Sequence, residues 1–123
     1  MVVHTSIKTN IQPESRLYMH ETPELNKVVK PFSHVTDYVK ELQQHRLEKV
    51  YVHLDGWGEP GYDNHHPDYN EPCEEAGGTQ AMKEMVETIH GAGYLFGIHD
   101  QYRDYYLRAP SFTWEKAVLL EDG

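Results

Sequence analysis

The sequence predicts an α/β fold in which single helices connect parallel strands. Two segments with the spacing of amphipathic helices alternate with three short segments typical of strands, and this order favours a parallel sheet. A long loop separates each of the first two strands from the helix that follows it. The expected order is therefore β-α-β-α-β with long βα loops.

The first strand and the first helix are expected in the first 46 residues. Residues 1–11 carry β-branched side chains in partial alternation, which predicts a strand. Residues 12–31 contain three prolines and no sustained periodicity, which is typical of a loop. Residues 32–46 are the expected helix, with helical spacing at Phe32, Val35, Val39, Leu42 and Arg46.

Residues 49–55 are the expected second strand, and its two faces differ in character. One face carries Val50, Val52 and Leu54, whereas the other carries Tyr51, His53 and Asp55. We expect the apolar face to be buried and the polar face to be available for chemistry.

The rest of the chain repeats the pattern of loop, helix and strand. Residues 56–78 form a loop rich in Gly, Pro, Asn and Asp, after which Thr79 can cap a helix. That helix is predicted from an apolar stripe at Met82, Met85, Val86 and Ile89. Residues 94–100 are the expected third strand, in which Gly97 indicates a close backbone approach.

Two architectures fit this order, a doubly wound sheet and a (β/α)8 barrel. A phosphate-binding sheet normally has a Gly-rich turn after its first strand, and neither GxGxxG nor GxxxxGK[ST] occurs in the chain. Polar residues at the carboxyl end of the second strand favour the barrel. A complete barrel needs about 250 residues. Residues 1–123 are therefore expected to be the N-terminal part of a single barrel domain, truncated at residues 119–123.

The composition argues against several partners. The chain has 20 acidic and 11 basic side chains, for a formal charge of −9, and the basic residues are scattered. A nucleic acid or a membrane surface is therefore not an expected partner. No apolar run approaches the roughly 18 residues of a membrane span, and residues 1–10 lack the pattern of a signal peptide. We expect a soluble chain without internal disulfides, because Cys73 is alone; the compartment is not indicated.

Polar and aromatic side chains follow the second and third strands. Asp55 and Trp57 could bind a sugar together, because a carboxylate accepts hydrogen bonds from hydroxyls and an indole stacks on a pyranose. The alternative is that Asp55 caps a turn and Trp57 packs as part of a lid. Asp100 and Tyr102 could line the same sugar site or belong to an ordinary loop.

Several motifs occur in an order that resembles a known group of glycosidases. They are His53-Leu54-Asp55-Gly56-Trp57, Gly77-Gly78, Ile89-His90-Gly91-Ala92-Gly93 and Leu95-Phe96-Gly97-Ile98-His99. Across residues 47–104 the chain resembles the second and third βα units of the α-galactosidase-like glycoside hydrolases. It looks most like the distant branch that includes endo-α-N-acetylgalactosaminidases.

The resemblance implies roles for individual residues. Asp55 matches the second aspartate of the family motif Asp-Asp-x-Trp, which holds sugar hydroxyls, and Trp57 matches its tryptophan. His99 lies where the family has a tyrosine that contacts the sugar. Leu54 replaces the first aspartate and His99 replaces that tyrosine, a difference that bears on the identity of the sugar.

The same resemblance implies that catalysis takes place elsewhere. In these retaining enzymes the nucleophilic aspartate follows the fourth strand and the acid/base carboxylate follows the sixth, both beyond residue 123. A retaining mechanism needs two carboxyl groups about 5 Å apart. We therefore expect a glycosidase fragment that is inactive alone, needs no cofactor and supplies residues that bind carbohydrate. The expected sugar-binding residues are His53, Asp55, Trp57, His99, Asp100 and Tyr102.

Two other functions stay open. A non-catalytic barrel could bind carbohydrate without hydrolysis. A metal-dependent hydrolase could instead use a set of His and Asp side chains at the strand ends. That set comprises His53, Asp55, His99 and Asp100.

The loop of residues 56–78 is expected to be a solvated acidic loop that partly orders over the sugar. Within it, His65, His66 and Asp68 are weaker candidates for binding a divalent metal ion. The histidines without a partner pattern, among them His4, are expected at the surface or in packing. Open strand edges in a partial barrel predict self-association.

Overall fold

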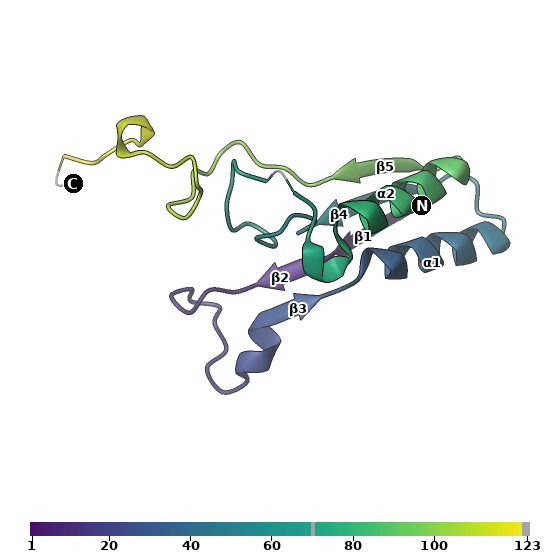
Figure 1. The fold of residues 1–123 in the computed structure, drawn as a ribbon, viewed down its shortest axis with the longest axis horizontal. Coiled ribbons are helices and arrows are strands. Elements are labelled where there is room, and N and C mark those ends of the chain that lie inside the picture. Colours follow the sequence, from purple (N-terminus) through teal and green to yellow (C-terminus); the bar gives the residue numbers. More distant parts are fainter. Residues whose placement is uncertain (70, 122–123) are drawn as a thin grey trace.

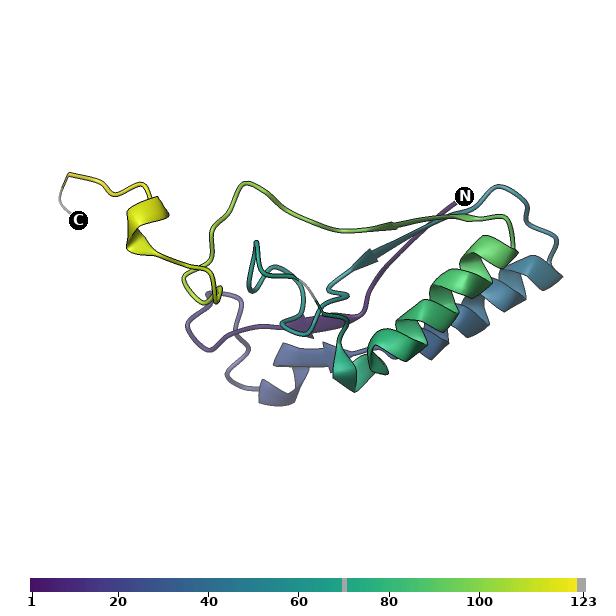
Figure 2. The same ribbon diagram turned by 45° about the horizontal axis from the view of Figure 1, so that its top comes forward.

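The chain folds as a parallel sheet covered on one face by two helices, in a computed structural model that describes residues 1–69 and 71–121. The strand order is β1 (Val2–Ser6), β4 (Tyr51–Asp55) and β5 (Leu95–Ile98). Helices α1 (Phe32–Gln44) and α2 (Gly78–Gly91) lie side by side against this sheet (Figure 1 and Figure 2). The predicted α/β class with parallel strands is confirmed. The truncation was expected at residues 119–123, of which Asp122 and Gly123 lie outside the described residues.

The hydrophobic core lies between the sheet and the helices. Val52 and Leu54 of β4 are fully buried, as the alternation in that strand predicts. The helices contribute Phe32 and Val39 from α1 and Met85 and Ile89 from α2. Burial of each such side chain contributes about 1.5 to 3 kcal/mol. Because one face of β4 is used in the core, its polar side chains point to the opposite face.

The first strand is shorter than predicted, because residues 1–11 divide into two strands at Ile7. There the Ile7 N–H donates to the Asp55 carbonyl at 2.9 Å, and the Lys8 N–H donates to the Gly56 carbonyl at 3.0 Å. β2 (Lys8–Asn10) then pairs with β3 (Lys27–Val29) in an antiparallel ribbon. The side-chain pattern is similar on both sides of Ile7, so it does not reveal this change of partner.

The prediction of a loop throughout residues 12–31 is wrong in its last part. A 3-10 helix, η1 (Pro23–Asn26), comes directly before β3. The buried Asn26 side chain accepts a hydrogen bond from the Met19 N–H at 2.7 Å and donates one to the Met19 carbonyl at 2.9 Å. A strand of three residues is too short to show alternation, and β3 depends on pairing with a strand that is distant in the sequence.

The helix ends differ from prediction by a few residues. α1 ends at Gln44 and not at residue 46, because Arg46 adopts a φ of 57°, which a right-handed helix does not contain. Thr79 does not cap α2. The helix begins at Gly78, after Gly77 with a φ of 112°, and no side chain caps it.

Two strands are also shorter than expected, which matters for the site. β4 begins at Tyr51 and not at residue 49, and β5 ends at Ile98, so His99 and Asp100 lie in the following loop. The remaining 3-10 helices are η2 (Glu74–Ala76) and η3 (Trp114–Lys116). Of the helices in the described residues, none is long and apolar enough to cross a membrane.

Candidate functional site

The candidate site lies where the three parallel strands end. His4 on β1, His53 on β4 and Gly97 on β5 are register partners. Because side chains alternate between the two faces of a sheet, these positions and every second position from them share the face that points away from the helices. Asp55 ends β4 on this face, and His99 follows the end of β5. The sheet thus brings together side chains that are distant in the sequence.

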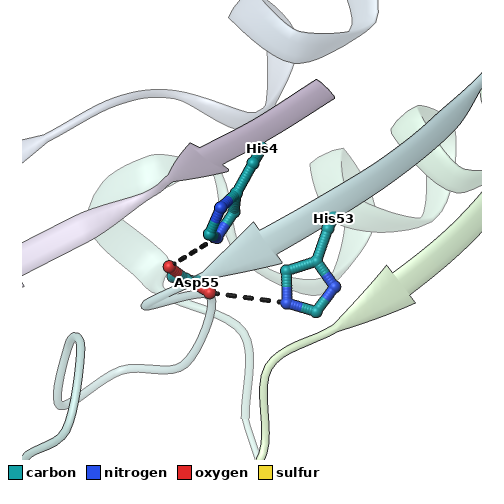
Figure 3. A group of neighbouring side chains, drawn as sticks. All are labelled: His4, His53 and Asp55. Carbon is teal, nitrogen blue, oxygen red and sulfur yellow. Dashed lines mark hydrogen bonds and ion pairs between the residues drawn. The ribbon is translucent and has the colours of Figure 1, made fainter. Parts of the chain in front are cut away.

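Asp55 is the centre of the first cluster, which Figure 3 shows. Its Oδ2 lies 2.7 Å from Nε2 of His4, and its Oδ1 lies 3.5 Å from Nε2 of His53 (Figure 3). Oδ1 also lies 3.9 Å from Nδ1 of His99. The Asp55 side chain is 17% exposed, so the carboxylate is held by its neighbours and still reaches solvent. His4 lies at the surface, as expected, with its side chain 57% exposed, but it has a partner that the sequence did not show.

Tyr51 and Gly97 fix the orientation of the His53 ring. The Tyr51 hydroxyl lies 2.7 Å from Nδ1 of His53. When the phenol donates to Nδ1, the N–H of the ring lies on Nε2, which faces Asp55. A Cβ at Gly97 would lie 2.3 Å from the Tyr51 hydroxyl oxygen. The predicted close approach at Gly97 is confirmed, and its reason is the space that this hydroxyl occupies.

A second cluster surrounds Asp63 in the loop after β4. Its Oδ1 lies 3.4 Å from Nε2 of His66 and 3.4 Å from Nε2 of His99. These three atoms are buried and have no hydrogen-bond partner among the residues that the structure describes. His66 is fully buried, with its ring stacked on that of Tyr69 at 4.7 Å. The expectation of a solvated loop is therefore wrong for this segment.

Among the residues that the structure describes, two groups of side chains are compact enough to bind a metal ion. In each group the ligand atoms lie within 4.8 Å of one another. The groups are His4, His53 and Asp55, and Asp63, His66 and His99. The second group is the better candidate, because its donor atoms are buried and make no hydrogen bond within the described chain.

The predicted metal site in the loop is not assembled as expected. Of the three candidates, only His66 belongs to a compact donor group, whereas His65 and Asp68 lie outside both groups. The Asp68 carboxylate accepts a hydrogen bond from the Ser111 N–H at 2.8 Å, and this contact lowers the pKa of Asp68. Asp68 therefore holds the chain after β5 in place.

The four-residue set expected for a metal-dependent hydrolase is also divided. His53 and Asp55 group with His4, whereas His99 belongs to the cluster around Asp63. Asp100 approaches only the second cluster, with its Oδ1 3.6 Å from Nδ1 of His66. The four residues are neighbours, but they do not form one set of ligands.

Carboxylates and burial keep the tyrosines of this region protonated. The charge of Asp63 raises the pKa of Tyr62, and burial raises the pKa of Tyr106. A hydrogen bond to Asp100 raises the pKa of Tyr102, a residue that is 91% exposed. These hydroxyls therefore stay available as hydrogen-bond donors, although Tyr102 does not form a fixed wall.

Trp57 packs inside the protein and does not present a stacking surface. The residue is 8% exposed, and its ring meets the ring of Tyr69 edge to face at 5.3 Å. Its Nε1 donates a hydrogen bond to the His99 carbonyl at 2.9 Å. Trp57 thus positions His99, which corresponds to the packing alternative and not to direct sugar stacking.

Sequence reasoning missed three residues of the site. His4 could have been found from register, because it shares its strand face with Ser6, which pairs with Asp55. Tyr51 was placed on the correct face of β4 but had no assigned role. Asp63 is one of several carboxylates near His65 and His66 in the sequence, which does not single it out, and only the folded loop places it between His66 and His99.

The sequence of the chain matches the family model of the endo-α-N-acetylgalactosaminidases over residues 14–121. The chain belongs to this family of glycoside hydrolases. The predicted resemblance is thereby confirmed, and it extends well beyond residues 47–104.

Solved structures similar to this endo-α-N-acetylgalactosaminidase-family chain include α-N-acetylgalactosaminidase NagBb from Bifidobacterium bifidum. Its complex with GalNAc is 45% identical, with a TM-score of 0.93, and its ligand-free form has the same values. Its quadruple mutant is 42% identical, with a TM-score of 0.92. Each covers 99% of the chain, which in turn spans only 20% of the NagBb chain, about a fifth. No curated protein matches the chain.

Proposed function

We propose that the chain supplies carbohydrate-binding strand ends to a retaining α-glycoside hydrolase whose catalytic carboxylates lie beyond residue 123. The observation that carries this proposal is the Asp55 carboxylate, which lies between His4 and His53 at the carboxyl end of the parallel strands. It occurs in a chain that is 45% identical to an α-N-acetylgalactosaminidase with a known GalNAc complex. The proposed substrate class is an α-linked N-acetylgalactosaminide.

The chemistry of the cluster supports sugar binding. Two imidazole nitrogens occupy part of the Asp55 carboxylate, and its remaining lone pairs can accept hydrogen bonds from sugar hydroxyls. His99 is partly exposed beside it and can add a ring nitrogen. Asp100 and Tyr102 are peripheral members of the proposed site, and Trp57 acts through the position of His99.

We also propose that residues 1–123 are part of a single (β/α)8 barrel domain. Within the described residues, β1 and β5 each have one unpaired edge. Val2 and Leu95 are exposed apolar residues on these edge strands, which further strands would cover. In the isolated chain the same edges favour self-association, which stays a prediction.

A chimera tests the proposed function in a complete enzyme. The segment of NagBb that matches this chain is replaced by residues 1–123, and hydrolysis of an aryl α-N-acetylgalactosaminide is measured. We expect kcat/KM within about tenfold of that of unmodified NagBb, a difference of about 1.4 kcal/mol. A chimera that melts cooperatively but does not bind N-acetylgalactosamine contradicts the proposal. The isolated chain is expected to bind this sugar in NMR titration without hydrolysing the glycoside.

A metal-binding role is a second candidate, favoured by three buried donor atoms that make no hydrogen bond within the described residues. These atoms are Asp63 Oδ1, His66 Nε2 and His99 Nε2, and the ligand atoms of this group lie within 4.8 Å of one another. Two imidazole nitrogens with one carboxylate oxygen suit a divalent transition metal such as Zn²⁺ better than Ca²⁺. A bound ion would satisfy these atoms and hold the loop after β4 against His99.

Metal content and thermal melting test this second candidate. The chain is equilibrated with Zn²⁺, and we expect about one bound equivalent and a higher melting temperature. His66→Phe keeps an aromatic ring against Tyr69 and removes both ring nitrogens, so it is expected to lose the bound metal and the shift. His34→Phe, at an exposed position on α1, is the matched control. Bound Zn²⁺ below about half an equivalent in the unmodified chain rules the site out.

A further inference from the structure

Tyr51 shares the polar face of β4 with Asp55 but lies far from the end of the strand. It begins β4, whereas Asp55 ends it. An extended chain rises about 3.3 Å per residue, so about 13 Å separate their Cα atoms. The Tyr51 side chain is partly buried, and its hydroxyl lies 2.7 Å from Nδ1 of His53, one step closer to the strand end. Tyr51 can therefore influence a sugar at Asp55 only through the His53 ring.

The two ring nitrogens of His53 face different partners. Nδ1 faces the Tyr51 hydroxyl, and Nε2 lies 3.5 Å from Oδ1 of Asp55, the contact drawn in Figure 3. A neutral imidazole carries one proton, which can be on either nitrogen. A proton on Nδ1 would leave the lone pair of Nε2 facing a carboxylate, which is repulsive. With the proton on Nε2, this N–H faces Asp55 and the Tyr51 hydroxyl can donate to the lone pair of Nδ1. The geometry therefore favours the proton on Nε2.

Gly97 leaves the space that the Tyr51 hydroxyl occupies. It is the register partner of His53 on the neighbouring strand β5. A Cβ at position 97 would overlap the Tyr51 hydroxyl oxygen and lie 3.1 Å from two carbons of its ring. A side chain at this position would therefore displace the hydroxyl from Nδ1 of His53. Tyrosine on one strand and glycine on the next together make room for this one hydrogen bond.

The position of the His53 ring determines how the Asp55 carboxylate is held. Oδ2 of Asp55 lies 2.7 Å from Nε2 of His4, and Oδ1 faces the ring of His53, which is the less exposed of the two histidines. When Nε2 of His53 donates to Oδ1, each carboxylate oxygen has a ring nitrogen beside it, and the remaining lone pairs keep one direction. A group that already has its binding geometry loses less entropy when the ligand binds.

We propose that Tyr51 is a positioning residue of the candidate site. Its hydroxyl donates to Nδ1 of His53, holds the ring in place and keeps the Nε2 proton directed at Asp55. In this role Tyr51 acts without touching the sugar. The effect on sugar binding rests on the proposed function of Asp55, whereas the placement of the proton does not.

Nitrogen NMR of the full chain with isotope-labelled histidines measures the placement of the proton. The pH is about 8, where an ordinary imidazole is neutral. We expect a protonated Nε2 and an unprotonated Nδ1 in His53, whose signals are identified by their loss in His53→Gln. Tyr51→Phe is expected to move the Nδ1 signal to that of a nitrogen without a hydrogen-bond donor. A proton on Nδ1 in the unmodified chain overturns the proposal, as does an Nδ1 signal that Tyr51→Phe leaves unchanged.

Steady-state kinetics of the NagBb chimera measure the effect on the site. Tyr51→Phe is expected to raise KM for the aryl α-N-acetylgalactosaminide about tenfold and to leave kcat within about threefold, because sugar binding is weakened equally in the ground state and the transition state. Gly97→Ala displaces the same hydroxyl and is expected to raise KM as well. The double variant is expected to have a KM within about twofold of the weaker-binding single variant, because both substitutions remove the same hydrogen bond.

Tyr94→Phe is the matched control. Tyr94 lies directly before β5, at the other end of that strand from His99, and its hydroxyl donates to the Leu47 carbonyl at 2.6 Å. The variant is expected to lower the melting temperature about as much as Tyr51→Phe and to keep KM within about twofold. A KM for Tyr51→Phe no higher than that of the control overturns the positioning role. If the unmodified chimera neither binds nor hydrolyses the glycoside, the proposed function fails. A proton on Nε2 and an Nδ1 signal that depends on Tyr51 support the placement of the proton even then.

Discussion

Asp55→Asn is expected to lower kcat/KM of the NagBb chimera at least about 100-fold towards an aryl α-N-acetylgalactosaminide. Two charge-assisted hydrogen bonds to sugar hydroxyls contribute about 1.5 kcal/mol each, and the neutral amide does not replace them. The amide nitrogen also replaces one of the two carboxylate oxygens that lie 2.7 Å from Nε2 of His4 and 3.5 Å from Nε2 of His53. Steady-state kinetics on the purified chimera measure the effect.

A matched substitution at another aspartate tests whether the loss of kcat/KM depends on the position of Asp55 or only on the removal of one negative charge. Asp37→Asn removes a carboxylate at an exposed position on α1 and is expected to leave kcat/KM within about twofold. Both variants are expected to melt near the temperature of the parent chimera. A loss below about fivefold for Asp55→Asn would show that this carboxylate does not hold the sugar.

Gly56→Ala is expected to destabilise the chain by about 3 kcal/mol or more. Gly56 directly follows Asp55 and has a φ of +55°, and a Cβ there would lie 2.2 Å from the Lys8 carbonyl oxygen. That carbonyl accepts a hydrogen bond from the Tyr62 N–H at 2.9 Å, and the Lys8 N–H donates to Gly56. The Lys8 backbone is therefore held by hydrogen bonds on both sides, and moving it away from the added Cβ would break them. Urea unfolding followed by circular dichroism measures the loss.

Gly93→Ala is the control for the left-handed conformation alone. Gly93 has a φ of +77°, and a Cβ there would meet nothing within 4 Å. Its substitution is expected to lower the free energy of unfolding by about 1 kcal/mol, which is the intrinsic penalty of an alanine in the left-handed conformation. Equal costs for the two glycines would contradict the argument that contact with Lys8 dominates at position 56.

The sequence predicted the long periodic elements and the strand-end residues well, because these depend on local pattern. The alternation of β4 placed Tyr51, His53 and Asp55 on one face, and the burial of Val52 and Leu54 agrees with it. Prediction was wrong where partners are distant. β2 lies within the strand predicted for residues 1–11, but its antiparallel pairing with β3 was not predicted, because β3 has only three residues and shows no pattern alone.

The candidate site was predicted in part for the same reason. Asp55 ends a strand and His99 follows one, so their position at the sheet edge could be inferred from the order of the elements alone. Whether a side chain at that edge is exposed depends on what covers it. Trp57 is covered by Tyr69, and it therefore packs where a sugar-stacking surface was expected.

By itself, the sequence determined the α/β class, the parallel order and the family resemblance, since hydrophobic periodicity and short motifs are local properties. Only the tertiary structure decided that His4 reaches Asp55 and that Asp63 and His66 meet His99. These contacts join residues on different strands and loops. The physical reason is that strand register and loop burial, which bring such side chains within hydrogen-bonding distance, are set by packing of the whole chain.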